Sequence, residues 1–366
     1  MRKILRWIAR IALALLLLGI LGAGYFLFLD GRAPARRPEL VRLPAGTPPA
    51  PRGFPTLNAL KLSFLLSRLE IIDTDGDIPV PAGVIEERDV EYGRAGDAPL
   101  LLDLYRPKTP QAAAAALIFI HGGGWKGGQR QDYKYYTVRF ADQGYVVATI
   151  SYRFSQQATF PGCVEDARCA VRWMRANAVR LQVDPERIAV VGGSAGGYLA
   201  LMTGFSSDVA EFDGTGGQGQ FSSRVAAVVD LYGPADLTTP FARQAPPVVG
   251  LLGKPYADDP ELYEWASPIR HLDAGDPPTL VIHGTIDDIV PVEQSDHLVE
   301  RLRELGVPHY YVRIDGWPHT LDANPRVNEY VRGIMAAFFA EHLGAGGRGG
   351  YGTMPRSDSR SPMTPP

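Results

Sequence analysis

The stretch RIAVVGGSAGGYLALMTG, residues 187–204, carries the strongest structural signal in the sequence. Its opening residues Arg187–Val191 form a short, mostly aliphatic run that predicts a buried strand, and Ala195–Gly204 predicts the helix that follows. Between the two lies GGSAG, residues 192–196, which fits the pattern G-x-S-x-G in the strand–turn–helix context that this pattern requires. The small residues allow a strained turn that lifts the Ser194 hydroxyl clear of the sheet. The alternative is a glycine-rich turn that only packs closely or cradles a phosphate.

A second glycine-rich loop, HGGGW at residues 121–125, directly follows an apolar run that predicts another buried strand. Consecutive glycines let backbone N–H groups point into a site without steric obstruction. We therefore expect the N–H groups of Gly123, Gly124 and Ala195 to receive the negative oxygen of a tetrahedral intermediate, as an oxyanion hole does.

Strands and helices alternate along the middle of the chain. The pattern predicts strands at 84–92, 100–105, 116–120, 145–152, 187–191, 225–232, 279–283 and 310–314, and helices at 133–142, 164–179, 195–204, 292–305 and 327–342. Such alternation predicts an α/β fold with a mostly parallel central sheet flanked by helices. The Pro-rich stretch 233–276 interrupts the alternation and is expected to be a loop-rich insertion near the active site.

Together, the motifs resemble the α/β-hydrolase superfamily, in its branch of hormone-sensitive-lipase-like and feruloyl-esterase-like carboxylesterases. The resemblance covers residues 84–343 and includes, besides the two glycine-rich motifs, Tyr152-Arg153, Phe160–Asp166, Ala170–Trp173, Ala266-Ser267-Pro268 and HGTIDDIVP at residues 283–291. In this superfamily the chain order is nucleophilic Ser, then acid, then His. The resemblance therefore implies Ser194 as nucleophile.

The resemblance also selects the acid and the base. The family pattern H-G-x-x-D-x-x-V-P selects Asp287 as the acid, with Asp288 as the fallback. The base is expected after the last strand, where GWPH places His319. The six other histidines fall on predicted helices, on or just before strands, or in the insertion, and are expected to be structural.

Four further residues are expected to have structural or pocket-forming roles. His121 is expected to hold its loop by hydrogen bonds, and Trp125 to bind substrate as a wall of the acyl pocket or to pack beside the site. Cys163 and Cys169 lie six residues apart on one predicted helix, a rise of about 9 Å, which exceeds the usual Cα separation of a disulfide. They are expected to be packed thiols.

Composition bounds the remaining classes of function. The chain has 366 residues, of which 45% are hydrophobic and 21% charged, and this excludes a disordered protein. A formal net charge of −3 removes the electrostatic reason to expect a nucleic-acid partner. Two cysteines exclude a disulfide framework and a thiolate zinc cluster. The expected chemistry needs no metal and no cofactor.

The two ends differ from the middle. Residues 11–29 carry no charge over 19 positions, about the length that spans a bilayer, and four basic residues precede them. We expect a basic N-terminal segment at 1–10, a transmembrane anchor at 11–29, a Pro-rich linker at 30–56, an amphipathic helix with a connector at 57–83, the catalytic domain at 84–343 and a disordered tail at 344–366. The amphipathic helix, expected at 57–72, could lie on the membrane or pack on the enzyme body. The catalytic domain is expected outside the cytoplasm; the alternative is a cleaved signal peptide and secretion.

The sequence thus predicts a membrane-anchored serine hydrolase that cleaves small or medium carboxylic esters through an acyl-enzyme. Two alternatives stay open: a serine peptidase or amidase of the prolyl-oligopeptidase type, and a noncatalytic hydrolase-like binding module. Acyl and alcohol specificity and the oligomeric state are not predicted.

Overall fold

The computed structural model describes residues 19, 21, 22, 24, 25, 27, 37–73, 78–109 and 113–344. Most of the predicted anchor at 11–29, the whole basic segment 1–10 and the tail from residue 345 lie outside the described residues. Within the described ranges, no helix has both the length and the apolar character needed to cross a membrane.

Eight strands form one sheet in the order β1-β2-β4-β3-β5-β6-β7-β8. The strands are β1 (Val84–Ala95), β2 (Ala98–Pro107), β3 (Ala114–Ile120), β4 (Val146–Ile150), β5 (Val183–Gly193), β6 (Ala227–Leu231), β7 (Thr279–Gly284) and β8 (His309–Ile314). β1 and β2 form an antiparallel pair and β2 is antiparallel to β4, whereas every other neighbouring pair is parallel. The predicted α/β fold with a mostly parallel sheet is confirmed.

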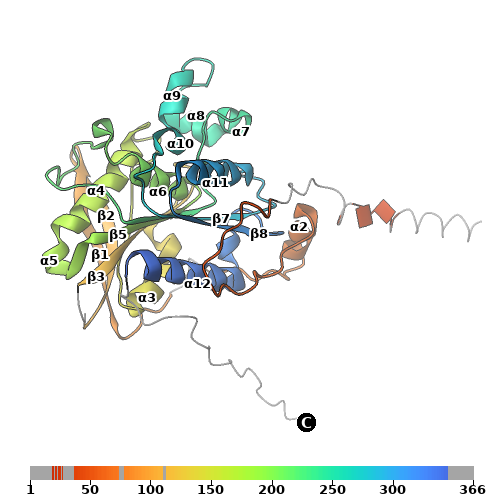
Figure 1. The fold of residues 1–366 in the computed structure, drawn as a ribbon, viewed down its shortest axis with the longest axis horizontal. Coiled ribbons are helices and arrows are strands. Elements are labelled where there is room, and N and C mark those ends of the chain that lie inside the picture. Colours follow the sequence, from red (N-terminus) through yellow and green to blue (C-terminus); the bar gives the residue numbers. More distant parts are fainter. Residues whose placement is uncertain are drawn as a thin grey trace, which may run out of the picture.

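Helices cover both faces of the sheet (Figure 1). One face carries α4 (Gly162–Ala176), α6 (Ala195–Phe205) and α11 (Glu293–Leu305), and the other carries α3 (Lys134–Asp142) and α12 (Pro325–His342). The strands between them are continuous apolar runs because both of their faces are buried. The single helix expected at 164–179 is instead two, because α4 ends at Ala176 and a short α5 (Ala178–Leu181) follows.

The insertion 233–276 is more helical than its composition predicted. It contains α7 (Pro240–Gln244), α8 (Pro246–Leu252), α9 (Pro260–Trp265) and α10 (Pro268–His271). Each of these helices begins at a proline, a residue whose fixed φ and missing N–H suit the first helical position. The prolines that indicated loop therefore mark helix starts.

The described part of the segment expected to be a Pro-rich linker packs on the enzyme body. Arg42 pairs with Tyr311 in an isolated antiparallel bridge along the edge strand β8. Further along, the Pro51 carbonyl accepts a hydrogen bond from the Trp317 indole, and the Phe54 ring meets that indole edge to face at 5.8 Å. Residues 37–56 therefore form a strap across β8 and the loop after it.

The helix expected at 57–72 ends early, as α2 (Leu57–Leu65). The Arg68 N–H donates to the Ser63 carbonyl and the Ser67 N–H to the Phe64 carbonyl, which is the Schellman pattern of a helix end. Ser67 takes the left-handed conformation with φ 52°, a position more often filled by glycine. The sequence therefore contained no glycine signal for this end.

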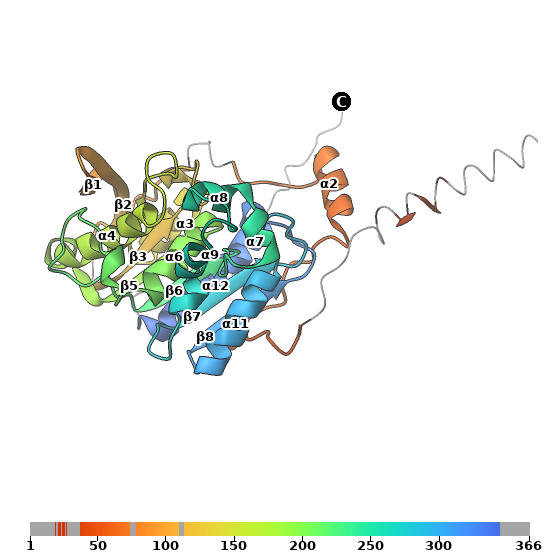
Figure 2. The same ribbon diagram turned by 90° about the horizontal axis from the view of Figure 1, so that it is seen from above.

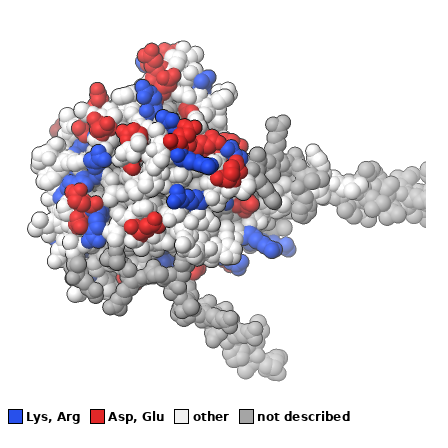
Figure 3. Space-filling view, viewed as in Figure 1, with Lys and Arg blue, Asp and Glu red and all other residues white. Residues whose placement is uncertain are grey.

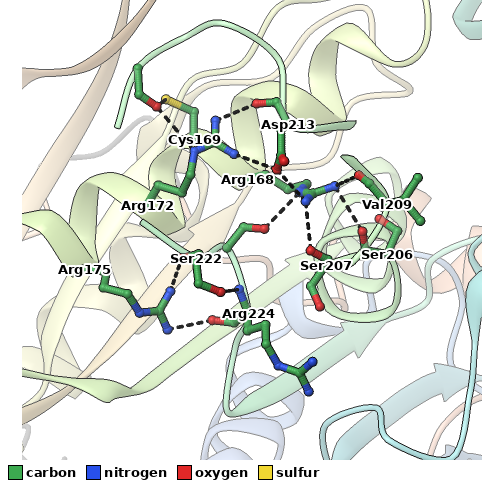
Figure 4. A network of polar contacts seen from close by, with 12 residues as sticks. Arg168, Cys169, Arg172, Arg175, Ser206, Ser207, Val209, Asp213, Ser222 and Arg224 are labelled. Atoms are coloured by element: carbon green, nitrogen blue, oxygen red, sulfur yellow. Dashed lines mark hydrogen bonds and ion pairs between the residues drawn. The ribbon is translucent and has the colours of Figure 1, made fainter. Parts of the chain in front are cut away.

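Three arginines of α4 hold the long loop that joins α6 to β6 (Figure 4). Arg168 is 1% exposed, and all five of its N–H groups have acceptors, namely the Ser223 hydroxyl, the carbonyls of Ser206, Ser207 and Val209, and the Asp213 carboxylate. Arg172 and Arg175 bind further carbonyls of the same loop. The buried guanidinium of Arg168 replaces the water that these carbonyls would otherwise need.

Elsewhere the charges are mixed. Lysines and arginines are interspersed with aspartates and glutamates over the described part of the face drawn in Figure 3. No large patch of a single sign gathers on the described residues of that face.

We predict that Arg168→Met lowers the free energy of unfolding by about 3 kcal/mol, because it leaves several buried carbonyls without donors. Arg175→Met is the matched control and costs about 1 kcal/mol or less, since Arg175 is only half-buried and water can replace its contacts. Denaturant unfolding followed by tryptophan fluorescence measures both. Equal losses for the two variants would contradict the role given to Arg168.

Candidate active site

The turn between β5 and α6 places Ser194 in a strained backbone conformation. Its φ is 56° and its ψ is −123°, and its N–H donates to the Leu231 carbonyl at 2.8 Å. The flanking glycines are required by close approach, because a Cβ on Gly192 would lie 2.0 Å from the Gly196 carbonyl oxygen, and one on Gly196 would lie 2.0 Å from that of Ile120. The hydroxyl of Ser194 is thereby raised above the carboxyl end of the sheet.

The structure brings together Ser194, His319 and Asp287. The Nδ1–H of His319 donates to Asp287 Oδ2 at 2.6 Å, which leaves Nε2 to accept from the Ser194 hydroxyl at 2.9 Å. The three residues follow β5, β8 and β7, whose carboxyl ends meet at one edge of the sheet. The arrangement suits transfer of the hydroxyl proton to the imidazole.

Asp287 is held as an anion by four donors. Besides the His319 ring, the backbone N–H groups of Ile289 and Val290 and the Nε2–H of His283 all donate to its carboxylate, at 2.8 to 3.1 Å. Burial alone would raise the pKa of Asp287, but the hydrogen bonds from the two histidines outweigh it and hold that pKa well below its ordinary value. An ionised acid at this position orients the base and stabilises its protonated form.

His283 is a site residue that the sequence analysis treated as structural. It is fully buried, its Nε2–H lies 3.1 Å from Asp287 Oδ2 and 2.9 Å from the Val290 carbonyl, and its Nδ1 accepts from the Ser295 hydroxyl. The ring thus fixes the acid and the loop after it. Asp288, the fallback for the acid, points elsewhere: it is half-exposed and pairs with Lys61 at 3.6 Å.

The glycine-rich loop after β3 lies opposite Ser194. Gly123 and Gly124 have φ values of 108° and 59°, which favour glycine, and both line the same cavity as Ser194. Among the described residues, the N–H groups of Gly123, Gly124 and Ala195 donate to no protein acceptor. They are therefore free to bind an oxygen of a substrate.

His121 and Trp125, the two residues of this loop that carry large side chains, do not line the cavity. His121 stacks on Tyr152 at 4.5 Å, and burial lowers its pKa below the ordinary histidine value. Trp125, expected as a wall of the acyl pocket, is 3% exposed, packs edge to face on Tyr198, and lies outside the cavity lining. Its positive φ of 56° turns the side chain into the core instead.

A cavity of about 410 Å³ opens beside Ser194 and His319. Its walls include Tyr133, Tyr136, Tyr232, Asp322 and Ile72, and no residue of the insertion 233–276. The Tyr232 hydroxyl donates to Asp322 at 2.5 Å, and its ring meets the His319 ring edge to face. Burial raises the pKa of Asp322, despite the hydrogen bond from Tyr232. This wall was not predicted from the sequence, although Tyr232 ends a predicted strand on the side where the site lies.

Both cysteines are free and buried, as predicted. Burial raises the pKa of the Cys163 thiol to about 12, so it stays protonated at neutral pH. In the part of the chain that the structure describes, no cluster of three or more His, Cys, Asp or Glu side chains is arranged to hold a metal ion.

Several known proteins with similar sequences are named as esterases. The BD-FAE family matches residues 102–302. The esterase LipC of Mycobacterium tuberculosis is 35% identical over 246 residues, which cover 65% of this chain and 60% of LipC. The probable carboxylic ester hydrolase LipM of the same organism is 31% identical over 242 residues, which cover 64% of this chain and 56% of LipM. The chain thus spans less than two thirds of the length of either relative.

Solved structures of esterases have a similar fold. A truncated form of a carbohydrate esterase from gut microbiota superposes with a TM-score of 0.63 at 26% identity, covering 71% of this chain and 96% of that one. A thermophilic esterase from the planctomycete Thermogutta terrifontis superposes with a TM-score of 0.61 at 27% identity, covering 71% and 92%. The fold is the α/β-hydrolase fold that these esterases share. Because the match spans more than half of the 366 residues, the chain belongs to the BD-FAE family.

The lowered pKa of Asp287 predicts how stability depends on pH. A carboxyl group whose folded pKa lies below its unfolded pKa stabilises the fold above the unfolded value, about pH 4, and loses that effect as the pH falls toward the folded value. The difference in free energy of unfolding between wild type and Asp287→Asn should be constant above about pH 5 and shrink below about pH 4. Denaturant unfolding from pH 7 to pH 2.5 measures it. A difference that does not change over this range would contradict the assignment.

Proposed function

We propose that the protein is a serine esterase that cleaves small or medium carboxylic esters through Ser194, His319 and Asp287. The observation that carries the proposal is the continuous chain of hydrogen bonds from Asp287 through His319 to Ser194, ending at a cavity. The esterase names of the relatives support the same reaction class.

In this proposal His319 Nε2 takes the proton from Ser194 as Oγ bonds to the ester carbonyl carbon. The carbonyl oxygen becomes negative and is bound by the N–H groups of Gly123, Gly124 and Ala195. When the C–O bond to the alcohol breaks, His319 returns its proton to the leaving alcohol. Water, deprotonated by His319, then attacks the acyl-enzyme, releases the carboxylic acid and restores Ser194. The ionised Asp287 stabilises the imidazolium in both halves.

The size of the cavity supports the substrate class. About 410 Å³ lies toward the lower end of small-molecule sites, which span about 300–1,000 Å³. Tyr133, Tyr136 and Tyr232 line the cavity together with Ser194, and walls of such bulky side chains favour small or medium acyl groups over long ones.

For localisation, we propose a single-pass N-terminal anchor at residues 11–29, with the catalytic domain outside the cytoplasm. The uncharged run and the basic residues before it support the proposal. A reporter fused to the C-terminus tests the sidedness, because only a reporter that works outside the cytoplasm should then be active.

The reaction predicts that purified full-length protein hydrolyses 4-nitrophenyl esters, and that Ser194→Ala lowers kcat/KM by at least about 10⁴-fold. A panel of acyl chains from two to sixteen carbons should show rates that fall beyond medium lengths. A parallel panel of peptide anilides should react far more slowly. Faster anilide cleavage would favour a peptidase, and no turnover of either panel by folded protein would contradict the proposal.

The assignment of Asp287 as the acid can be tested against its neighbour Asp288 as a matched control. Asp287→Asn should lower kcat on the order of 10⁴-fold, because the amide no longer holds His319 in the tautomer that accepts the Ser194 proton. Asp288→Asn should retain nearly full activity, because the side chain is half-exposed and faces Lys61. Steady-state kinetics on one short ester compares the two. A reversed ranking would assign the acid to Asp288.

A further inference from the structure

The end of α2 carries an unusual group of exposed apolar side chains. The members of this group, which we call the α2 rim, are Phe64 (58% exposed), Leu65 (78%), Leu66 (52%) and Ile71 (50%). Both views place α2 at one edge of the molecule, apart from the layers of sheet and helices (Figures 1 and 2). Single exposed apolar residues need no explanation, but four within eight positions mark an interaction surface.

The α2 rim is joined to the mouth of the active-site cavity. Ile72, the residue after the rim, lines the cavity, and its N–H donates to the Ala323 carbonyl at 2.7 Å. Ile289, which also lines the cavity, is 58% exposed and follows Asp288, the ion-pair partner of Lys61 on α2. Whatever covers the rim therefore also lies at the entrance to the site.

The start of α2 is tied to the apolar segment near the N-terminus. Thr56 is the N-cap of α2, and its hydroxyl donates to the carbonyl of Leu27 at 2.5 Å. Leu27 belongs to the uncharged run 11–29, whose length and composition suit a bilayer. A bilayer that contains this run would therefore have its surface close to α2.

We propose that the α2 rim docks on the surface of a lipid bilayer and presents the cavity entrance to it. The occupant is lipid because α2, the helix that leads into the rim, is joined at its start to the chain's own membrane-spanning candidate, and because exposed Arg68 within the rim suits anionic headgroups. The enzyme then takes esters dissolved in that bilayer, which reach Ser194 past Ile72 and Ile289. This last step, unlike the docking, rests on the proposed esterase function.

The docking is tested with full-length protein reconstituted in lipid nanodiscs that contain some anionic lipid. An environment-sensitive fluorophore is attached to Leu65→Cys or, as the control, to Val179→Cys, an equally apolar position that is 95% exposed and lies on α5. The native cysteines are buried and should not react. Lipids that carry a quencher near the headgroup should quench the probe at 65 and leave the probe at 179 unchanged. Equal quenching at both positions, or none at 65, overturns the proposal, as does a blue-shifted but unquenched probe at 65, which indicates a second protein copy.

The route of the substrate is tested by a Leu65→Ser, Leu66→Ser double variant, with Val179→Ser as control. Turnover of 4-nitrophenyl octanoate, a medium-chain ester that partitions into the nanodisc, should fall about tenfold or more, while turnover of a soluble acetate ester stays unchanged. Equal loss on both esters, or no loss on either, overturns entry from the bilayer. If wild type hydrolyses neither ester, the proposed function fails, whereas the quenching result still decides the docking.

Discussion

The strained backbone of Ser194 is the constraint on which the rest of the structure depends. A residue with side chain at φ 56° and ψ −123° persists only where its surroundings leave it no alternative. Here the Ser194 N–H is held by a hydrogen bond to the Leu231 carbonyl. Glycines also bring strand β5 and helix α6 so close together that no Cβ would fit between them. Helix α6 is held in turn by the loop that Arg168 binds from α4. The position of one hydroxyl thus depends on packing that extends through several layers of the domain.

The parallel sheet brings together side chains that are far apart in the sequence. Gly123, Ser194, Tyr232, Asp287 and His319 each follow a different strand, and in a parallel sheet these strand ends lie at one edge. Each side chain is then held in place by its own hydrogen bonds or ring contacts. Asp287 has donors from two rings and two backbone groups, whereas His319 is held between Asp287 and the edge of Tyr232. Because these supports are separate, loops at the entrance can differ without disturbing the hydrogen-bonded centre.

Sequence reasoning predicted the parallel sheet and the three hydrogen-bonded side chains, because buried strands and short motifs leave local patterns. It did not predict features that depend on which distant segments meet. Tyr232 and Asp322 are ordinary residues in the sequence and become a cavity wall only when β6 and the loop after β8 come together. Predictions from single residues were wrong where a residue type occurs in two kinds of local structure. Prolines in the insertion were interpreted as loop residues but begin four helices, and α2 ends just before Ser67, where no glycine signals the end.

The strap of residues 37–56 has a consequence for the exposed edge of the sheet. β8 is an edge strand, and such strands offer unpaired N–H and carbonyl groups to any other chain in an extended conformation. Arg42 occupies that edge by exchanging both hydrogen bonds with Tyr311, and Phe54 binds the Gly316 carbonyl just before the loop of His319. The strap therefore protects the protein against edge-to-edge aggregation while it steadies the loop of the base. A soluble fragment that keeps these properties has to include the strap of residues 37–56, and one that begins at the first strand leaves the edge of β8 exposed to other chains.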